Sequence, residues 1–173
     1  MSWKITNLKK DKQSITSDWD LKDQKLIDGV RFKEVKNVMK FDGMLTEVYR
    51  KDWALDDEDV DQVFQIKMHP GAISGWHAHE YTTDRIFIND GVIRVVLYDG
   101  RQDSPTYGLI NEFKAGISRP MLVGIPPKVF HAVQNIHYGE SSLLNIVDKA
   151  YEYEGPDHWR VPIDHPDIPY KFG

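Results

Sequence analysis

Short runs of β-branched and other apolar residues, broken by turn-forming residues, recur through most of the chain. The runs cover residues 63–68, 85–87, 92–98, 121–125 and 143–147. Turn sequences such as His69-Pro70-Gly71 and Asn89-Asp90-Gly91 lie between them. No long stretch has the 3.6-residue period of a helix, so the pattern predicts an antiparallel β-sandwich or barrel.

Three histidines and one aspartate have the spacing of ligands for a divalent metal. His77 and His79 are two residues apart, so on a strand both imidazoles point to the same face. Asp84 follows five residues later, and His131 lies in a separate predicted strand. We therefore predict that His77, His79, Asp84 and His131 bind a divalent transition metal. The ligand types do not choose between Fe, Mn, Ni, Zn and Cu.

The same spacing resembles the two sequence motifs of the cupin superfamily. The first motif is matched by Gly71, His77, His79 and Gly91. The second is matched by Pro126, His131 and Asn135. Asp84 stands where cupins usually carry glutamate, and Lys128 replaces a glycine. The resemblance implies an all-β fold, the double-stranded β-helix or jelly-roll barrel, with the histidines in the barrel mouth.

We expect this barrel to have extensions at both ends. Residues 1–25 are polar and charged and are predicted to form an N-terminal extension or arm. Residues 26–173 are predicted to form a single cupin domain. Its aromatic and Pro-rich end, from Tyr151 onward, should be an extended C-terminal tail.

Further segments resemble the dTDP-4-dehydrorhamnose 3,5-epimerase family of cupins. They are residues 26–30, 42–49, 95–108 and 163–170, of which Ser104-Pro-Thr-Tyr-Gly108 is the most specific. The resemblance implies an epimerase that works without metal. In that family a histidine base, held by an aspartate, removes the proton next to a ketone. A lysine then stabilises the enolate, and a tyrosine returns a proton.

The catalytic positions of that family are only partly kept in this chain. The base falls on His77, and its aspartate partner falls on Asp164 or Asp167. The enolate lysine falls on Asp84, whose carboxylate would repel an enolate. Arg85 or a metal would then have to supply the positive charge.

Other family positions also differ. The arginine before the motif histidine becomes Ser74, and the phosphate-contacting arginine becomes Asp42. The tyrosine has no clear equivalent near residues 144–148, whereas Glu47 keeps the glutamate that lies near the nucleotide base. What the metal-free epimerase needs is partly missing, and what a metal-binding cupin needs is present.

Several side chains near these motifs are candidate substrate contacts. Trp76 and Tyr81 flank the predicted ligands, where they could stack on a sugar or simply pack in the barrel wall. Arg94 is in phase with Val92 and Val96, so it is predicted either to bind an anion inside the barrel or to face solvent. The histidines interpreted as surface or packing residues are His69, His137, His158 and His165.

Composition limits the possible partners. A net charge of −5 argues against a nucleic-acid binder, because phosphate neutralisation needs a basic surface. No apolar run reaches the length of a membrane span, and the absence of cysteine and of a signal-peptide start suits the cytoplasm. Exposed sheet edges and the family resemblance favour a homodimer.

We predict an isomerase or epimerase that acts on a sugar or sugar nucleotide, with a bound metal replacing the lost lysine. Two alternatives remain open from sequence alone. One is a metal-dependent cupin of other chemistry, such as a dioxygenase. The other is a barrel that binds a small ligand without turning it over.

Overall fold

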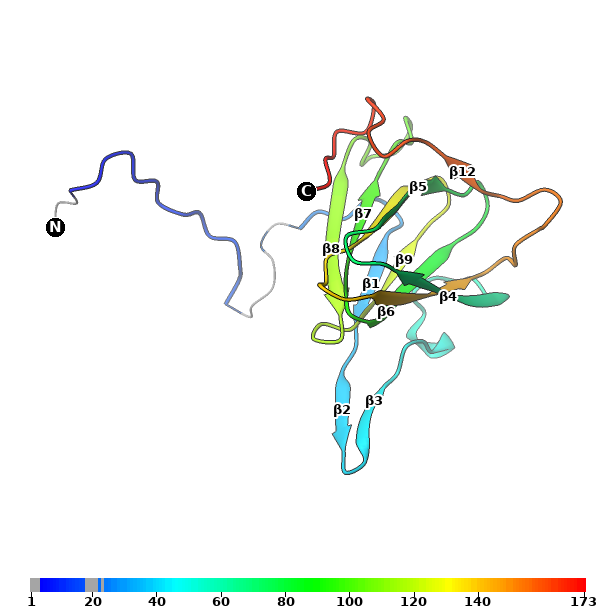
Figure 1. Ribbon diagram of the computed structural model, residues 1–173. Coiled ribbons are helices and arrows are strands. Elements are labelled where there is room, and N and C mark those ends of the chain that lie inside the picture. The colour runs from blue at the N-terminus through cyan, green and yellow to red at the C-terminus, as the bar shows by residue number, and fades with distance from the viewer. Residues whose placement is uncertain (1–3, 18–21, 23) are drawn as a thin grey trace.

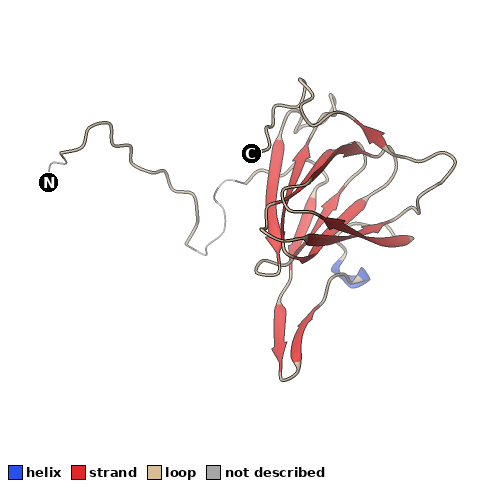
Figure 2. Cartoon of the chain, in the orientation of Figure 1, coloured by secondary structure: helices blue, strands red, loops and turns tan. Residues whose placement is uncertain are grey.

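Two five-stranded sheets face each other in the computed structural model, which describes residues 4–17, 22 and 24–173 (Figure 1). One sheet has the order β1-β9-β6-β11-β4 and the other β12-β5-β10-β7-β8. The strands of the first are β1 (Arg31–Glu34), β9 (Met121–Ile125), β6 (Asp84–Asp90), β11 (Ser141–Val147) and β4 (Gln62–Met68). Those of the second are β12 (Trp159–Arg160), β5 (Ile73–Ala78), β10 (Phe130–Asn135), β7 (Val92–Tyr98) and β8 (Ile110–Gly116). This order confirms the predicted all-β cupin barrel, which Figure 2 shows as strands joined by loops.

Alternate side chains of strand β7 contribute to two apolar clusters, one inside the barrel and one on its outer face. Ile93, Val95 and Leu97 point inward and are fully buried among the core residues between the two sheets. Val96 and Tyr98 point the other way, into a second apolar cluster on the outer face. Complete burial of an aliphatic side chain stabilises a fold by roughly 1.5–3 kcal/mol, so the core holds both sheets together.

The C-terminal tail covers the outer face of the β5-containing sheet. Ile168, Tyr170 and Phe172 pack against the buried indole of Trp76. The Trp76 ring N–H donates a hydrogen bond of 3.2 Å to the carbonyl of Ile163. The expected extended tail is therefore part of the packing around β5.

A small hairpin projects from the barrel (Figure 1). It consists of β2 (Asn37–Lys40) and β3 (Gly43–Thr46), which pair only with each other. A short 3-10 helix, η1 (Lys51–Trp53), follows it. Several apolar side chains of the hairpin are exposed, among them Met39, Met44 and Phe41, the last of which is 109% exposed.

The Ser-Pro-Thr-Tyr-Gly block folds into the turn that follows β7. The carboxylate of Asp99 is buried there and accepts hydrogen bonds from Arg101, Ser104 and Thr106. These donors hold the pKa of Asp99 well below its usual range, although burial acts in the opposite direction. The block therefore fixes the loop between β7 and β8.

Ile27 and Val30 are the first residues of the described chain that are buried in the core. The described residues 4–17 of the predicted N-terminal extension lie apart from the barrel in Figure 1. Residues 1–3, 18–21 and 23 of that predicted extension lie outside the described residues. In the part of the chain that the structure describes, no helix has the length and apolar character needed to cross a membrane.

Candidate functional site in the barrel mouth

The pairing of β5 with β10 brings two predicted site residues together. His77 and His131 are direct partners across these antiparallel strands, so their side chains lie on the same face. Their ring centroids are 5.8 Å apart. A register shift between His131 and Val133 separates this pair from the rest of the β5–β10 ladder.

A carboxylate stands between two of the histidines. Oδ2 of Asp84 lies 3.3 Å from Nε2 of His79 and 3.9 Å from Nε2 of His131. One ligand atom from each of the three residues lies within 4.8 Å of the others. The Asp84 side chain is nearly inaccessible to solvent, and Asn145 donates a 2.6 Å hydrogen bond to its Oδ1. Asn145 thus holds the carboxylate with Oδ2 toward the histidines.

Backbone carbonyls set the orientation of both imidazoles. Nδ1 of His131 lies 3.2 Å from the carbonyl of Val129, and Nδ1 of His79 contacts the carbonyl of Asp157. A carbonyl only accepts, so Nδ1 carries the proton in each neutral ring. The lone pair of each Nε2 therefore faces Asp84, as in histidines that bind a metal and are oriented by a second hydrogen bond.

A fourth histidine, interpreted from sequence as a surface or packing residue, completes the cluster. The ring of His158 lies 4.6 Å from that of His77 and 5.1 Å from that of His79. It arrives there because the short strand β12 pairs with β5. No spacing motif links residue 158 to the others, so only the long-range pairing could have revealed it.

Burial favours the neutral form of His77, His131 and His158. It lowers the pKa of His77 to about 3, with further lowering from His131, His158 and Arg160. Burial also lowers the pKa values of His131 and His158. Nε2 of His77 and Nε2 of His158 are buried and have no hydrogen-bond partner within the described chain. Neither nitrogen is occupied by another group of the described chain, so each is open to a ligand.

The donor set fits a divalent metal. His79, Asp84 and His131 supply two imidazole nitrogens and one carboxylate oxygen at close range. His77 and His158 have unpartnered nitrogens beside them. Imidazole and carboxylate ligands with open positions suit several transition metals.

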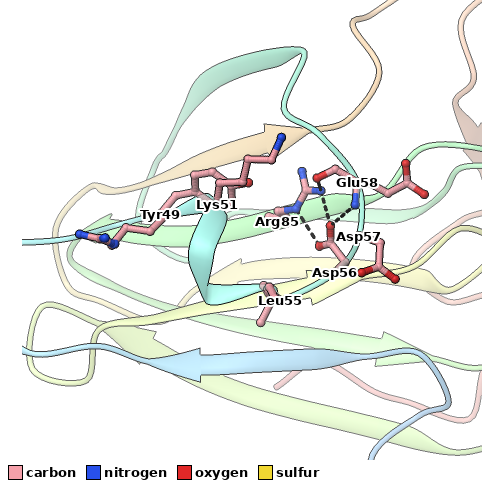
Figure 3. A pocket seen from close by; sticks show the side chains of 9 residues that line it. Tyr49, Lys51, Leu55, Asp56, Asp57, Glu58 and Arg85 are labelled. Atoms are coloured by element: carbon pink, nitrogen blue, oxygen red, sulfur yellow. Dashed lines mark hydrogen bonds and ion pairs between the residues drawn. The ribbon is translucent and has the colours of Figure 1, made fainter.

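Arg85 lies on the opposite face of β6 from Asp84, away from the mouth. Its guanidinium is 0% exposed and is bound to the Asp56 carboxylate through Nε at 2.7 Å and through Nη2. Figure 3 shows this pair in a pocket of about 200 Å³ that is also lined by Tyr49, Lys51 and Leu55. The positive charge of Arg85, which the sequence suggested as a replacement for the family's lysine, therefore lies on the outer face of the sheet and not at the histidine cluster.

Arg94 and Trp76 also lie on an outer face. Arg94 donates to Gln134 at 3.2 Å and lies 3.6 Å from Glu112, beneath the C-terminal tail. It is therefore not in the barrel, because the inward positions of β7 are 93, 95 and 97 and not 92, 94 and 96. Trp76 is fully buried under the same tail and cannot stack on a ligand in the mouth.

The remaining predicted residues are exposed. Tyr81 lies just past the histidines, with 62% of its surface accessible. Glu47 follows β3 and pairs with Arg50 at 3.3 Å. Asp164 lies in the tail, and no hydrogen bond or ion pair joins it to His77 in the described chain. Asp84 is the carboxylate that meets the histidine cluster.

The double-stranded β-helix with a polar site in its mouth defines the class of protein as a cupin. No model of a known protein family matches the sequence. The chain is 36% identical over 123 residues to a probable low-salt glycan biosynthesis epimerase, Agl13, of Haloferax volcanii, covering 70% of this chain and 79% of that protein. It is 32% identical over 147 residues to the spore coat polysaccharide biosynthesis protein SpsL of Bacillus subtilis, covering 85% and 97%.

Solved structures agree with these relatives. A dTDP sugar isomerase from Desulfovibrio desulfuricans G20 superimposes with a TM-score of 0.78 at 25% identity. The match covers 84% of this chain and 91% of that one. The chain therefore belongs to the family of these glycan-biosynthesis epimerase relatives, and it shares the cupin-like fold of the dTDP sugar isomerase.

Proposed function

We propose that this protein is an epimerase or isomerase that moves a proton next to the carbonyl of a sugar nucleotide, with a divalent metal in the barrel mouth. The observation that carries the proposal is the juxtaposition of a neutral histidine with a metal-type cluster. His77 has an unpartnered Nε2, and its ring lies 5.8 Å from that of His131, a member of the cluster with Asp84. The family relationship supplies the substrate class.

His77 is assigned the role of base. Its Nε2 is buried beside the cluster and has no hydrogen-bond partner within the described residues, so it is open to a proton from a substrate carbon. A base must be free of its proton before it can take one from a carbon acid. Removal of the proton leaves an enolate whose negative charge must be stabilised where it forms.

Asp84 cannot provide that stabilisation by itself, because it is a carboxylate at the position of the family's lysine. A divalent ion held by His79, Asp84 and His131 would act as a Lewis acid on the carbonyl oxygen. Asn145 keeps Asp84 in the orientation that this binding requires. Asp84 would then serve as a metal ligand, and its charge would no longer repel the enolate.

The experiment is solvent exchange. A 4-keto sugar nucleotide is incubated in D₂O with metal-loaded protein, and NMR follows loss of the proton signals at the carbons beside the ketone. Wild type and the control His137→Ala should exchange, whereas His77→Asn should exchange at least about 100-fold more slowly. Absence of exchange in wild type loaded with each of Fe, Mn, Ni, Zn and Cu would exclude the proposed reaction.

We further propose that the protein acts as a homodimer. The β2–β3 hairpin exposes Met39, Phe41 and Met44 to solvent in the single chain. Neighbouring exposed apolar side chains on a projecting element favour association with another surface. A second copy of the same chain offers a symmetric way to cover them.

A further inference from the structure

A carboxylate from a distant part of the chain holds the turn that joins two of the metal-type donors. His79 follows β5 and Asp84 begins β6, so residues 80–83 set the separation of these two side chains. The carboxylate of Asp157, in the loop before β12, accepts hydrogen bonds from the first three amides of this turn. Asp157 lies 77 positions after the first of them. The turn is therefore fixed by a tertiary contact and not only by its own sequence.

Both oxygens of the Asp157 carboxylate take part. Oδ1 accepts a hydrogen bond of 2.7 Å from the amide of Glu80. Oδ2 accepts one of 2.9 Å from the amide of Tyr81. The same oxygen accepts bonds of 3.1 Å from the amide and 3.0 Å from the hydroxyl of Thr82. Hydrogen bonds to an ionised acceptor are roughly twice as strong as those between neutral groups, so these four bonds order the turn.

The main chain of Asp157 contacts the site as well. Its carbonyl accepts the hydrogen bond from Nδ1 of His79. The next residue is His158, whose ring lies 5.1 Å from that of His79. One residue therefore contacts both the His79 ring and the turn that leads from His79 to Asp84.

The short side chain of Asp84 makes the course of this turn important. Aspartate is one methylene shorter than the glutamate that cupins usually carry, so it reaches less far toward the histidines. Its Oδ2 nevertheless lies 3.3 Å from Nε2 of His79. A turn without the clamp would sample conformations in which the two groups separate, and binding a metal would then have to order it.

We propose that Asp157 is a positioning residue, whose carboxylate holds His79 and Asp84 at the separation that a divalent metal requires. The inference rests on the function proposed above, because the metal is part of it. It assigns part of the metal affinity to a side chain that contacts neither the metal nor the substrate. Contacts of this kind orient metal ligands before the metal arrives.

The test measures Zn²⁺ affinity and amide hydrogen exchange in the full chain. Zn²⁺ is titrated into metal-free protein in competition with a chromogenic chelator, and NMR follows exchange of the amides of residues 80–82 before metal is added. Asp157→Asn should weaken Zn²⁺ binding by about 10- to 100-fold. The three amides should exchange at least about 10-fold faster. The substitution keeps the Asp157 carbonyl, so these changes report on the carboxylate.

Control variants separate positioning from stability. Asp99→Asn removes another carboxylate that accepts several hydrogen bonds within a loop. It should lower the free energy of unfolding but keep the Zn²⁺ affinity of wild type. Thr82→Val removes one of the four bonds to Asp157 and keeps the shape of the side chain, so it should weaken Zn²⁺ binding less than Asp157→Asn does. Thr82→Ser keeps the hydroxyl and should bind Zn²⁺ as wild type does.

The outcomes distinguish the positioning role from the proposed reaction. Unchanged Zn²⁺ affinity in Asp157→Asn and Thr82→Val would overturn the positioning role and leave the reaction intact. An equal loss of affinity in Asp99→Asn would also overturn it, because instability alone would then explain the effect. Weakened binding in Asp157→Asn, without solvent exchange by metal-loaded wild type, would keep the positioning role and exclude the reaction. A wild type that binds no Zn²⁺ would overturn both proposals.

Discussion

Asp84 and Arg85 are neighbours in β6 whose side chains act on opposite sides of the sheet. The carboxylate of Asp84 meets His79 and His131 in the mouth, and the guanidinium of Arg85 binds Asp56 on the outer face. Strand geometry imposes this separation, because successive side chains alternate between faces. Two adjacent charges of opposite sign therefore do not neutralise each other.

This separation predicts opposite phenotypes for two adjacent substitutions. Asp84→Asn should lose bound metal, because the carboxylate becomes a neutral amide, and should change the free energy of unfolding little. Arg85→Met should keep metal but destabilise the fold by about 3 kcal/mol, since it leaves Asp56 without its partner. Plasma mass spectrometry and urea denaturation measure the two quantities. Metal loss in Arg85→Met with an unchanged fold would contradict the assignment of faces.

Metal retention should also distinguish the histidines. His131→Ala should abolish it, because His131 is buried and its Nε2 faces Asp84. His137→Ala should retain the metal, because His137 lies in the exposed loop after β10. The measurement is metal per chain after gel filtration. Equal metal in both variants would remove the cluster as the binding site.

Acidification should destabilise the metal-free protein. Burial lowers the pKa of His77 from 6.5 to about 3, so between these values the unfolded chain binds a proton that the folded chain does not. The free energy of unfolding should therefore fall as the pH drops from 6.5 toward 3, by at most about 1.4 kcal/mol per pH unit for this group. Thermal unfolding from pH 7.5 to 4.5 checks this, and His77→Asn should show a smaller decrease.

The conformation of Lys128 predicts an unusual gain in stability. Lys128→Gly should raise the free energy of unfolding by about 1 kcal/mol, because glycine adopts a positive φ without strain. Gly91→Ala provides the opposite comparison at φ +70°. A Cβ there would lie 2.0 Å from Oγ of Ser141, so that variant should be destabilised. Chemical denaturation of both variants would show whether the lysine is strained.

Association should depend on the projecting hairpin. Phe41→Ser should shift the protein from dimer to monomer, because the most exposed aromatic side chain of the hairpin is lost. Light scattering coupled to gel filtration measures the mass directly. Tyr138→Ser, equally exposed but on the loop between β10 and β11, should not change it. A monomeric wild type would exclude the dimer.

The barrel and part of its site could be predicted from the chain because their signals are local. Strand runs end at turn residues, and two histidines two apart must share a face. His158 gave no such signal, since its place depends on the pairing of β12 with β5, whose partners Trp159 and Ala78 are 81 residues apart in the chain. Local patterns contain no information about such a pairing.

Arg94 shows a different limit of sequence reasoning. Its strand has apolar residues on both faces, because the C-terminal tail covers the outer one. Alternation normally tells the inner face from the outer, but Val95 and Val96 are both fully buried. Either phase fits the sequence, and only the tail's position shows that Arg94 points outward.

The acceptors for Nδ1 of His79 and His131 belong to the main chain, at Asp157 and Val129. Replacing either residue leaves its carbonyl in place, so no single codon change at those positions abolishes the acceptor. The carboxylate of Asp84 belongs to a side chain, so a single substitution at that position removes it. The tautomers of His79 and His131 should therefore be kept through more substitutions than the carboxylate of Asp84. A descendant of this protein that lost Asp84, and with it the metal that we propose, would still hold both rings in the orientation that binds one.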